Sequence, residues 1–150
     1  MATTKTSRAR KTKTVARKRK AAAPAPRAKR LPKGVSAAIR AAFDKKALDV
    51  VVLDLRKAGG FTDYFVICTG TSGRQIQAIA DGVKTALKAD LGERPVLAEG
   101  VEKSQWILLD YFDFVVHVFS RECRDFYALE RLWGNAERRQ ISDAPSEAPS

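Results

Sequence analysis

The chain has 150 residues and a formal net charge of +11 at pH 7, which leaves room for one ordinary domain and its tails. No apolar run approaches the roughly 18–20 residues needed to cross a bilayer, and the N-terminus lacks the apolar segment of a secretory signal. We therefore expect no membrane partner. Two cysteines, Cys68 and Cys123, are too few for a disulfide framework, and with a single histidine they argue against a four-ligand zinc site.

The positive charge is concentrated at the N-terminus. Residues 1–33 contain 13 Lys or Arg and no acid, whereas residues 34–150 contain 15 bases and 17 acids, a net charge of −2. With few large apolar residues and three prolines, residues 1–33 are predicted to be a disordered basic tail. Three interpretations stay open: a solvated tail, a non-specific contact to phosphates, and a mitochondrial transit peptide.

The first half of the remaining chain predicts a helix, two strands and a second helix. Val35 to Phe43 carries apolar residues at helical spacing. Residues 49–55 and 64–68 are continuous apolar runs, typical of strands buried on both faces. Helical spacing returns over residues 72–87, where Ser72 followed three positions later by Gln75 fits a capping box.

The second half predicts three strands and a last helix. The strands are expected at residues 96–99, 106–110 and 113–119, the last two as a hairpin around Tyr111-Phe112. The helix is expected from Ser120 to Trp133, and residues 135–150 are predicted to be a frayed C-terminal tail. The sequence therefore predicts an α/β domain at residues 34–134, with about five strands in a mixed sheet and helices on both faces.

The strand-to-helix turn from Gly70 to Gly73 is the most enzyme-like feature. Free backbone N–H groups at such a turn can bind phosphate. The turn matches neither the P-loop nor the dinucleotide-binding motif, and Gly, Ser and Thr also serve as caps there. A nucleotide-binding turn and a purely structural turn both stay open.

His117, Asp110 and Asp113 are the side chains most able to carry acid–base chemistry or hold a metal. No serine or cysteine motif marks a nucleophile beside the histidine, so we favour a hydrogen-bonded structural or interface role for His117. The two aspartates flank the predicted hairpin turn, beside Trp106 and Tyr111. Such an aromatic and acidic edge suits a protein partner that bears Lys or Arg.

The motifs of the folded part resemble those of a known family, the ribosomal silencing factors related to the plant protein Iojap. The resemblance covers roughly residues 36–134. The matching residues are the run Thr62 to Ser72, Arg74-Gln75, Glu99-Gly100, Trp106 to Asp110, Asp113, Val116 to Phe119, and the segment Arg124 to Trp133.

The resemblance implies a translation repressor and not an enzyme. The fold would look like that of the nucleotidyltransferases without their catalytic acids, with no cofactor, no metal and no catalytic residue. The partner would be the large ribosomal subunit, contacted through the universal large-subunit protein fourteen, so that the small subunit cannot join when nutrients are scarce. The resemblance also implies an ability to form homodimers, and a cytoplasmic location or, as the alternative, an organelle matrix.

Carried over residue by residue, the resemblance assigns a partner surface to six residues: Trp106, Asp110, Asp113, His117, Glu99 and Tyr127. The slightly acidic charge of residues 34–150 suits a basic ribosomal protein. One departure is the turn Tyr111-Phe112, where the family commonly has an aliphatic residue and glycine. The alternative function is a nucleotidyltransferase-like enzyme that binds a nucleotide at Gly70 to Gly73 and uses Asp110 and Asp113.

Overall fold

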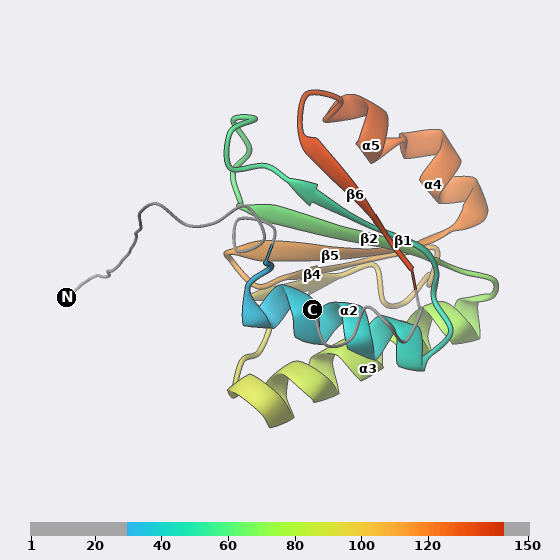
Figure 1. The fold of residues 1–150 in the computed structure, drawn as a ribbon. Helices are drawn as coiled ribbons and strands as arrows, with labels where there is room; N and C mark the ends of the chain where they lie inside the picture. Colours follow the sequence, from blue (N-terminus) through green and yellow to red (C-terminus); the bar gives the residue numbers. More distant parts are fainter. Residues whose placement is uncertain (1–29, 143–150) are drawn as a thin grey trace. The chain divides into compact units, whose positions relative to one another are not determined.

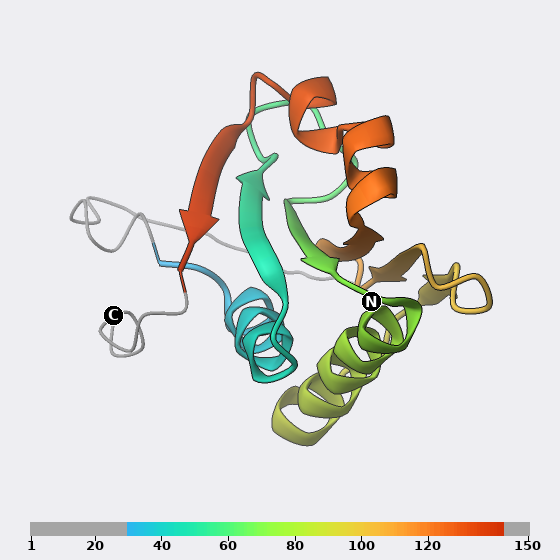
Figure 2. The same cartoon turned by 90° about the vertical axis from the view of Figure 1, so that its right-hand side faces the viewer.

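A computed structural model describes residues 30–142 of the chain. They form a six-stranded mixed sheet with helices on both faces (Figures 1 and 2). The fold class predicted from the sequence is confirmed, with one strand more than expected. In chain order the elements are α2 (Lys33–Asp44), β1 (Leu48–Asp54), β2 (Tyr64–Gly70), α3 (Gly73–Leu91), β3 (Leu97–Glu99), β4 (Trp106–Asp110), β5 (Phe114–Ser120), α4 (Arg121–Tyr127), α5 (Leu129–Leu132) and β6 (Glu137–Ile141).

The strand order is β3-β4-β5-β2-β1-β6. The central strands β2 and β5 run parallel, with Tyr64 opposite Phe114 and Gly70 opposite Ser120, and every other pair is antiparallel. All seven residues of β2 are buried, because helices cover both sides of the sheet at its centre. This double coverage explains why β1, β2 and β5 are continuous apolar runs and do not alternate.

Helices α2 and α3 pack against each other on one face of the sheet (Figure 2). The apolar stripe of α3 is buried at Ile76, Ile79 and Leu87, as the helical spacing predicts. The Ser72 side chain caps the helix by accepting a hydrogen bond from the backbone N–H of Gln75, at 3.1 Å. At the other end Gly92 is left-handed, and its N–H donates to the Lys88 carbonyl while the N–H of Glu93 donates to that of Leu87.

Helices α4 and α5 lie over the opposite face (Figure 1). The core on this side contains Val51, Phe65, Ile67 and Phe119, with Trp133 packed against it. The prediction of one helix from Ser120 to Trp133 is wrong, because Ala128 is left-handed (φ 46°) and divides the segment into α4 and α5. Nothing in the sequence marks this break, since alanine favours helix.

The C-terminal segment also differs from expectation. Residues 137–141, predicted to fray, form the edge strand β6, which pairs antiparallel with β1 from Asp54 opposite Glu137 to Val50 opposite Ile141. The strand is charged and mostly exposed, so it lacks the apolar pattern from which a strand is predicted. Backbone pairing with the buried neighbour β1 holds it in place. The rest of the predicted C-terminal tail from residue 143 on, and the predicted basic tail before residue 30, lie outside the described residues.

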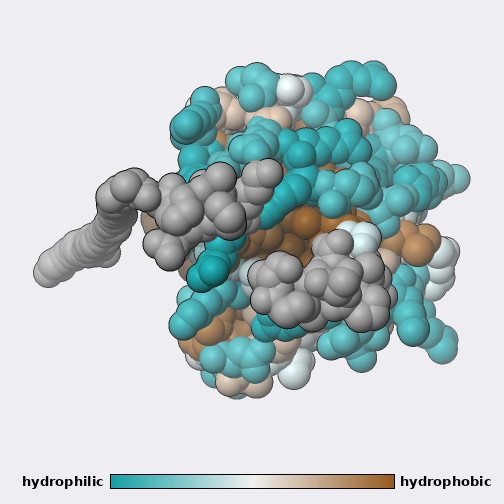
Figure 3. Space-filling view, in the orientation of Figure 1, coloured by the Kyte–Doolittle hydropathy of each residue, from teal (hydrophilic) through white to brown (hydrophobic). Residues whose placement is uncertain are grey.

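The predicted hairpin between β4 and β5 is confirmed. Its turn is closed by a hydrogen bond from the Tyr111 N–H to the Phe114 carbonyl, at 2.9 Å. Phe112, at the tip, is left-handed (φ 78°) and 76% exposed. Figure 3 shows that on the face of the molecule drawn there, hydrophilic side chains surround a narrow strip of apolar ones.

Candidate functional site

Trp106 and His117 form a hydrogen-bonded pair between the neighbouring strands β4 and β5. The indole Nε1 donates to Nδ1 of the imidazole at 3.1 Å. Trp106 is half-buried, and its ring packs on Phe119 with 4.9 Å between centroids and against Tyr127 with 4.6 Å. The tryptophan is therefore part of the core and part of the surface.

His117 does not reach the surface. Its residue is 3% exposed, and burial lowers its pKa to about 3, so the ring is neutral at pH 7. Because Nδ1 accepts from the indole, the proton of the neutral ring is on Nε2. Among residues 30–142, Nε2 has no hydrogen-bond partner. Of the two roles predicted for His117, the hydrogen bond to Trp106 supports the structural one. Its place on a partner surface stays a prediction, and at 3% exposure it would act there through Trp106.

Four further side chains lie on the same side of the sheet as Trp106, two of them exposed and two half-buried. Strand alternation places Asp110 and Leu108 on this side, and the register sets Leu97 opposite Asp110 and Glu99 opposite Leu108. Because α4 packs over β5 and β2, the β3–β4 part of this face remains open. The sequence missed Leu97 and Leu108, although their alternation with Ala98 and Leu109 was a usable signal.

We define the open face as the β3–β4 face. It consists of Leu97, Glu99, Trp106, Leu108, Asp110 and Tyr127. Leu97 is 46% exposed and Tyr127 is 47% exposed, so large apolar groups lie in solvent next to two carboxylates. This composition is typical of a protein-binding surface.

Asp113 lies apart from this face, at the turn after β4. Its pKa is raised by partial burial, and it lies close enough to Asp63 and Glu93 for its charge to help raise their pKa values, after burial as the main cause. Asp110 has a different partner: its carboxylate accepts a hydrogen bond from the N–H of Phe112 at 2.8 Å. The two aspartates that the sequence grouped together therefore belong to different local clusters.

The Gly70 to Gly73 turn is filled by a side chain of the protein itself. The Gln75 Oε1 accepts from both the N–H and the hydroxyl of Thr71, at 2.6 and 2.8 Å. The Gln75 Nε2 donates to the carbonyls of Lys45 and Lys46, at 3.0 to 3.1 Å. The turn thus joins the start of α3 to the loop after α2, which is a structural role.

The residues of the alternative enzyme site do not come together. Gly70 is at the end of β2 beside Ser120, whereas Asp110 pairs with Val115 at the other end of β5. Five residues of strand, roughly 17 Å, separate the two positions. Thr62 of the same motif donates its hydroxyl to the Phe112 carbonyl at 2.8 Å and so fixes the hairpin turn. No group of three potential metal ligands occurs within residues 30–142.

Most of the chain matches the model of one protein family. The model for the ribosomal silencing factor during starvation matches residues 28–150. The chain belongs to this family. Within the described range, none of the helices is both long and apolar enough to span a membrane.

Individual relatives agree with the family assignment. The ribosomal silencing factor RsfS of Bacillus subtilis is 41% identical over 99 residues, which cover 66% of this chain and 83% of that protein. The chloroplastic protein Iojap of Zea mays is 38% identical over 100 residues, 65% of this chain and 42% of the maize protein. The resemblance inferred from the sequence motifs is confirmed.

A solved structure carries the same fold. The crystal structure of protein CV0518 from Chromobacterium violaceum superposes with a TM-score of 0.66 and 35% sequence identity, covering 75% of this chain and 93% of that one. The relatives are named for a regulatory role on ribosomes. As a family member, this chain is a ribosome-associated factor in translational control.

Proposed function

We propose that the β3–β4 face binds the large ribosomal subunit through the universal large-subunit protein fourteen, and that the bound domain keeps the small subunit from joining. The observation that carries the proposal is the open row of Leu97, Trp106 and Tyr127 beside Glu99 and Asp110. No bond is made or broken in this mechanism. The domain acts by occupying a surface.

The chemistry of the face suits a basic ribosomal protein. Trp and Tyr supply large rigid contacts at low entropic cost, which is why they dominate binding hot spots. The carboxylates of Glu99 and Asp110 would steer a Lys- or Arg-bearing partner and fix its register. His117 contributes indirectly, because its hydrogen bond fixes the orientation of Trp106 before binding and so reduces the entropy lost in the complex.

Asp113 has a secondary role in binding. It lies beyond the end of β4, in the cluster with Asp63 and Glu93, and it adds negative charge near the face without forming part of it. Homodimer formation, predicted from the resemblance, stays a prediction.

The basic tail is proposed to add non-specific attraction to ribosomal RNA. Arg17, Lys18, Arg19 and Lys20 are four consecutive cations. Their replacement by glutamine in the full chain should make large-subunit affinity less sensitive to salt, because fewer phosphate counterions are released on binding. An unchanged salt dependence would remove the tail from the mechanism.

The central test is co-sedimentation with purified large and small subunits, followed by a subunit-joining assay. The double variant Glu99→Lys/Tyr127→Ala should lose large-subunit binding, because both positions are exposed on the β3–β4 face. Asp90→Lys is the matched control, since Asp90 is exposed on α3, on the opposite face of the sheet. Raised salt suppresses the contribution of the tail in all three proteins.

The outcomes separate the site from the function. Binding of the double variant at wild-type strength would place the contact elsewhere. If subunits join undisturbed in the presence of excess protein, steric silencing is wrong whatever the site.

A further inference from the structure

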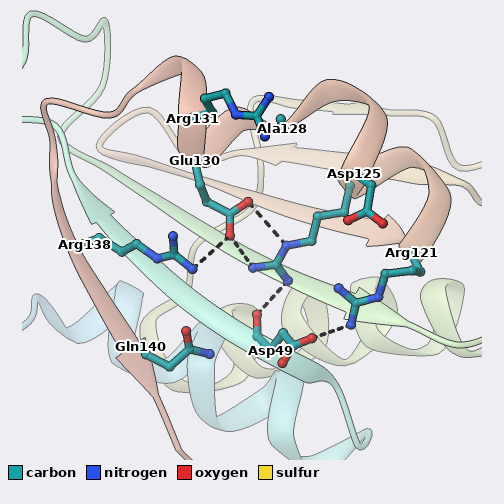
Figure 4. A pocket seen from close by; sticks show the side chains of 9 residues that line it. Asp49, Arg121, Asp125, Ala128, Glu130, Arg131, Arg138 and Gln140 are labelled. Carbon is teal, nitrogen blue, oxygen red and sulfur yellow. Dashed lines mark hydrogen bonds and ion pairs between the residues drawn. The ribbon is translucent and has the colours of Figure 1, made fainter.

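A second site candidate lies on the side of the sheet where α4, α5, β1 and β6 meet. A pocket of about 530 Å³ opens there, and Figure 4 shows charged side chains directed into it from all four elements. None of the residues that line it belongs to the β3–β4 face. The sequence did not indicate it, because the pocket depends on the break at Ala128 and on strand β6, neither of which was predicted.

The deepest lining side chain is Arg124 of α4, which is 6% exposed. It donates to the Glu130 carboxylate at 2.6 Å, to the Asp49 carbonyl at 2.7 Å and to the Thr69 hydroxyl at 2.8 Å. The arginine also lowers the pKa of Glu130, which is held below its ordinary value despite partial burial. This network ties α4 and α5 to β1 and β2 and forms a rigid floor.

Around this floor the pocket holds more guanidinium donors than acceptors. Arg121 forms an ion pair with Asp49 through one nitrogen, and Arg138 shares the Glu130 carboxylate at 3.7 Å. In the part of the chain that the structure describes, no carboxylate lies within 4.0 Å of Arg131. Each guanidinium offers five N–H donors, so Arg121, Arg131 and Arg138 have most of theirs unused.

The charges of the lining side chains also favour an anionic ligand. Four arginines line the pocket with three carboxylates, and two of these carboxylates, Asp49 and Glu130, are already paired. The third, Asp125, has no ion pair among residues 30–142 and is the one lining group that opposes an anion. The net charge of the lining is therefore positive by one.

We infer that this pocket binds a small ligand carrying two linked phosphate groups, such as pyrophosphate or the diphosphate of a nucleotide. Planar guanidiniums bind phosphate oxygens through paired, charge-assisted hydrogen bonds. The volume lies within the range of about 300–1,000 Å³ typical of small-molecule sites, more than a single phosphate fills. No aromatic side chain lines the pocket, so the phosphates, and not a stacked base, would provide the recognition.

The test is a titration of the full ¹⁵N-labelled chain, followed by NMR at the backbone amides of Ala128, Arg131 and Gln140. The probes are pyrophosphate, adenosine diphosphate, guanosine diphosphate and inorganic phosphate, at constant ionic strength. A site-resolved signal is needed because the basic tail also attracts polyanions. Saturable shifts at the three amides are expected with each diphosphate, and binding of inorganic phosphate at least several-fold weaker.

Three variants sharpen the test. Arg131→Gln should weaken binding about tenfold by removing a bidentate contact, and this exposed side chain has no partner in the described residues whose loss would unfold the protein. Asp125→Asn should strengthen binding, because it removes the opposing charge. Arg74→Gln, on the other face of the sheet, removes the same charge as Arg131→Gln and should leave affinity unchanged.

The relative affinities for the four probes show which part of the ligand is recognised. Equal affinity for pyrophosphate and both nucleotides supports recognition of the diphosphate alone, whereas much tighter binding of one nucleotide than of pyrophosphate would overturn it. Shifts that do not saturate, shifts confined to the tail, or equal weakening by Arg74→Gln and Arg131→Gln would overturn it. Because large-subunit binding is measured separately, failure here leaves the proposed silencing function standing.

Discussion

The indole Nε1 of Trp106 donates its hydrogen bond to Nδ1 of His117, a buried imidazole that accepts only while it is neutral. The pair therefore couples the position of a surface tryptophan to the protonation state of a core histidine. Protonation would place a proton on Nδ1 and turn an acceptor into a donor that faces the indole N–H.

The first prediction is that the protein loses stability as the pH falls below about 6.5. Burial lowers the pKa of His117 to about 3 in the folded state, whereas an unfolded histidine titrates near 6.5. Between these values the unfolded chain binds a proton that the native chain does not, so the free energy of unfolding decreases as the pH decreases. The loss from this group between pH 7.5 and pH 5 is up to about 2 kcal/mol.

Urea unfolding of the wild type and of His117→Gln, at pH 7.5, 6.5 and 5.5, measures this effect. Glutamine keeps a hydrogen-bond acceptor for the indole but does not titrate in this range. The variant should therefore show a flatter dependence of unfolding free energy on pH, whatever its stability at pH 7.5. Parallel curves for the two proteins would mean that His117 is not the group responsible.

Most of the fold was predictable from hydrophobic patterns, because those patterns record burial. The runs at β1, β2 and β5 and the stripe of α3 mark buried faces, and Ser72 marks the start of α3 through its cap. The pattern failed where backbone geometry decides. Ala128 is left-handed without a glycine, and β6 is a charged strand held by pairing with β1.

The site was predictable only in part, for a related reason. Family motifs pointed to Trp106 and Asp110, and alternation along β4 correctly puts both on one face. The apolar run of β5 indicates that His117 is buried, but its ring contacts with Trp106 and Phe65 of other strands need the tertiary fold. The grouping of Asp113 with Asp63 and Glu93 also needs the tertiary fold.

The second prediction concerns Gly100, which precedes β4 by a short loop and is left-handed (φ 85°). A Cβ at this position would overlap the Trp106 carbonyl oxygen, which belongs to rigid backbone. Gly100→Ala should therefore lower the free energy of unfolding by about 3 kcal/mol or more and displace Trp106. Gly92→Ala is the control, because Gly92 is also left-handed but has open space around it, so its cost should be about 1 kcal/mol.

Thermal or urea denaturation of the two variants gives the comparison, with tryptophan fluorescence as a probe of Trp106. Equal losses for the two alanines would show that backbone conformation alone, and not the overlap with β4, determines the requirement at Gly100.

The third prediction is that Phe112→Gly does not destabilise the hairpin. Phe112 is left-handed, which costs a non-glycine residue about 1–2 kcal/mol, and its 76% exposed ring gains little from burial. Glycine removes that cost but adds unfolded-state entropy of about 0.5–1 kcal/mol. The net change should be neutral to about 1 kcal/mol stabilising, measured by urea unfolding. A clear loss of stability would show that the phenyl ring makes contacts that its exposure conceals.

The last prediction concerns the buried network on Arg124. Replacement by methionine keeps most of the side-chain volume but leaves the Glu130 carboxylate without its main partner and deprives the Thr69 hydroxyl and the Asp49 carbonyl of a donor. Breaking a buried pair on one side costs about 3–5 kcal/mol, so α4 and α5 should detach or the domain should unfold at lower urea. Arg56→Met is the matched control, because Arg56 pairs with Asp54 at the surface, with 53% of its side chain exposed, and such pairs contribute about 0–1 kcal/mol.

The double variant Arg124→Met/Glu130→Gln separates two contributions to the loss of stability: the missing hydrogen bonds of Arg124 and the cost of leaving the Glu130 carboxylate unpaired. If the cost of Arg124→Met comes mainly from the unpaired carboxylate, removing that charge as well should restore part of the stability, since the double variant no longer buries an ion without a partner. If the double variant is as unstable as Arg124→Met alone, the hydrogen bonds to β1 and β2 carry the stability. In that case Arg124 holds α4 to the sheet through its contacts with Asp49 and Thr69. Glu130 then contributes little to stability and mainly orients the arginines of the pocket.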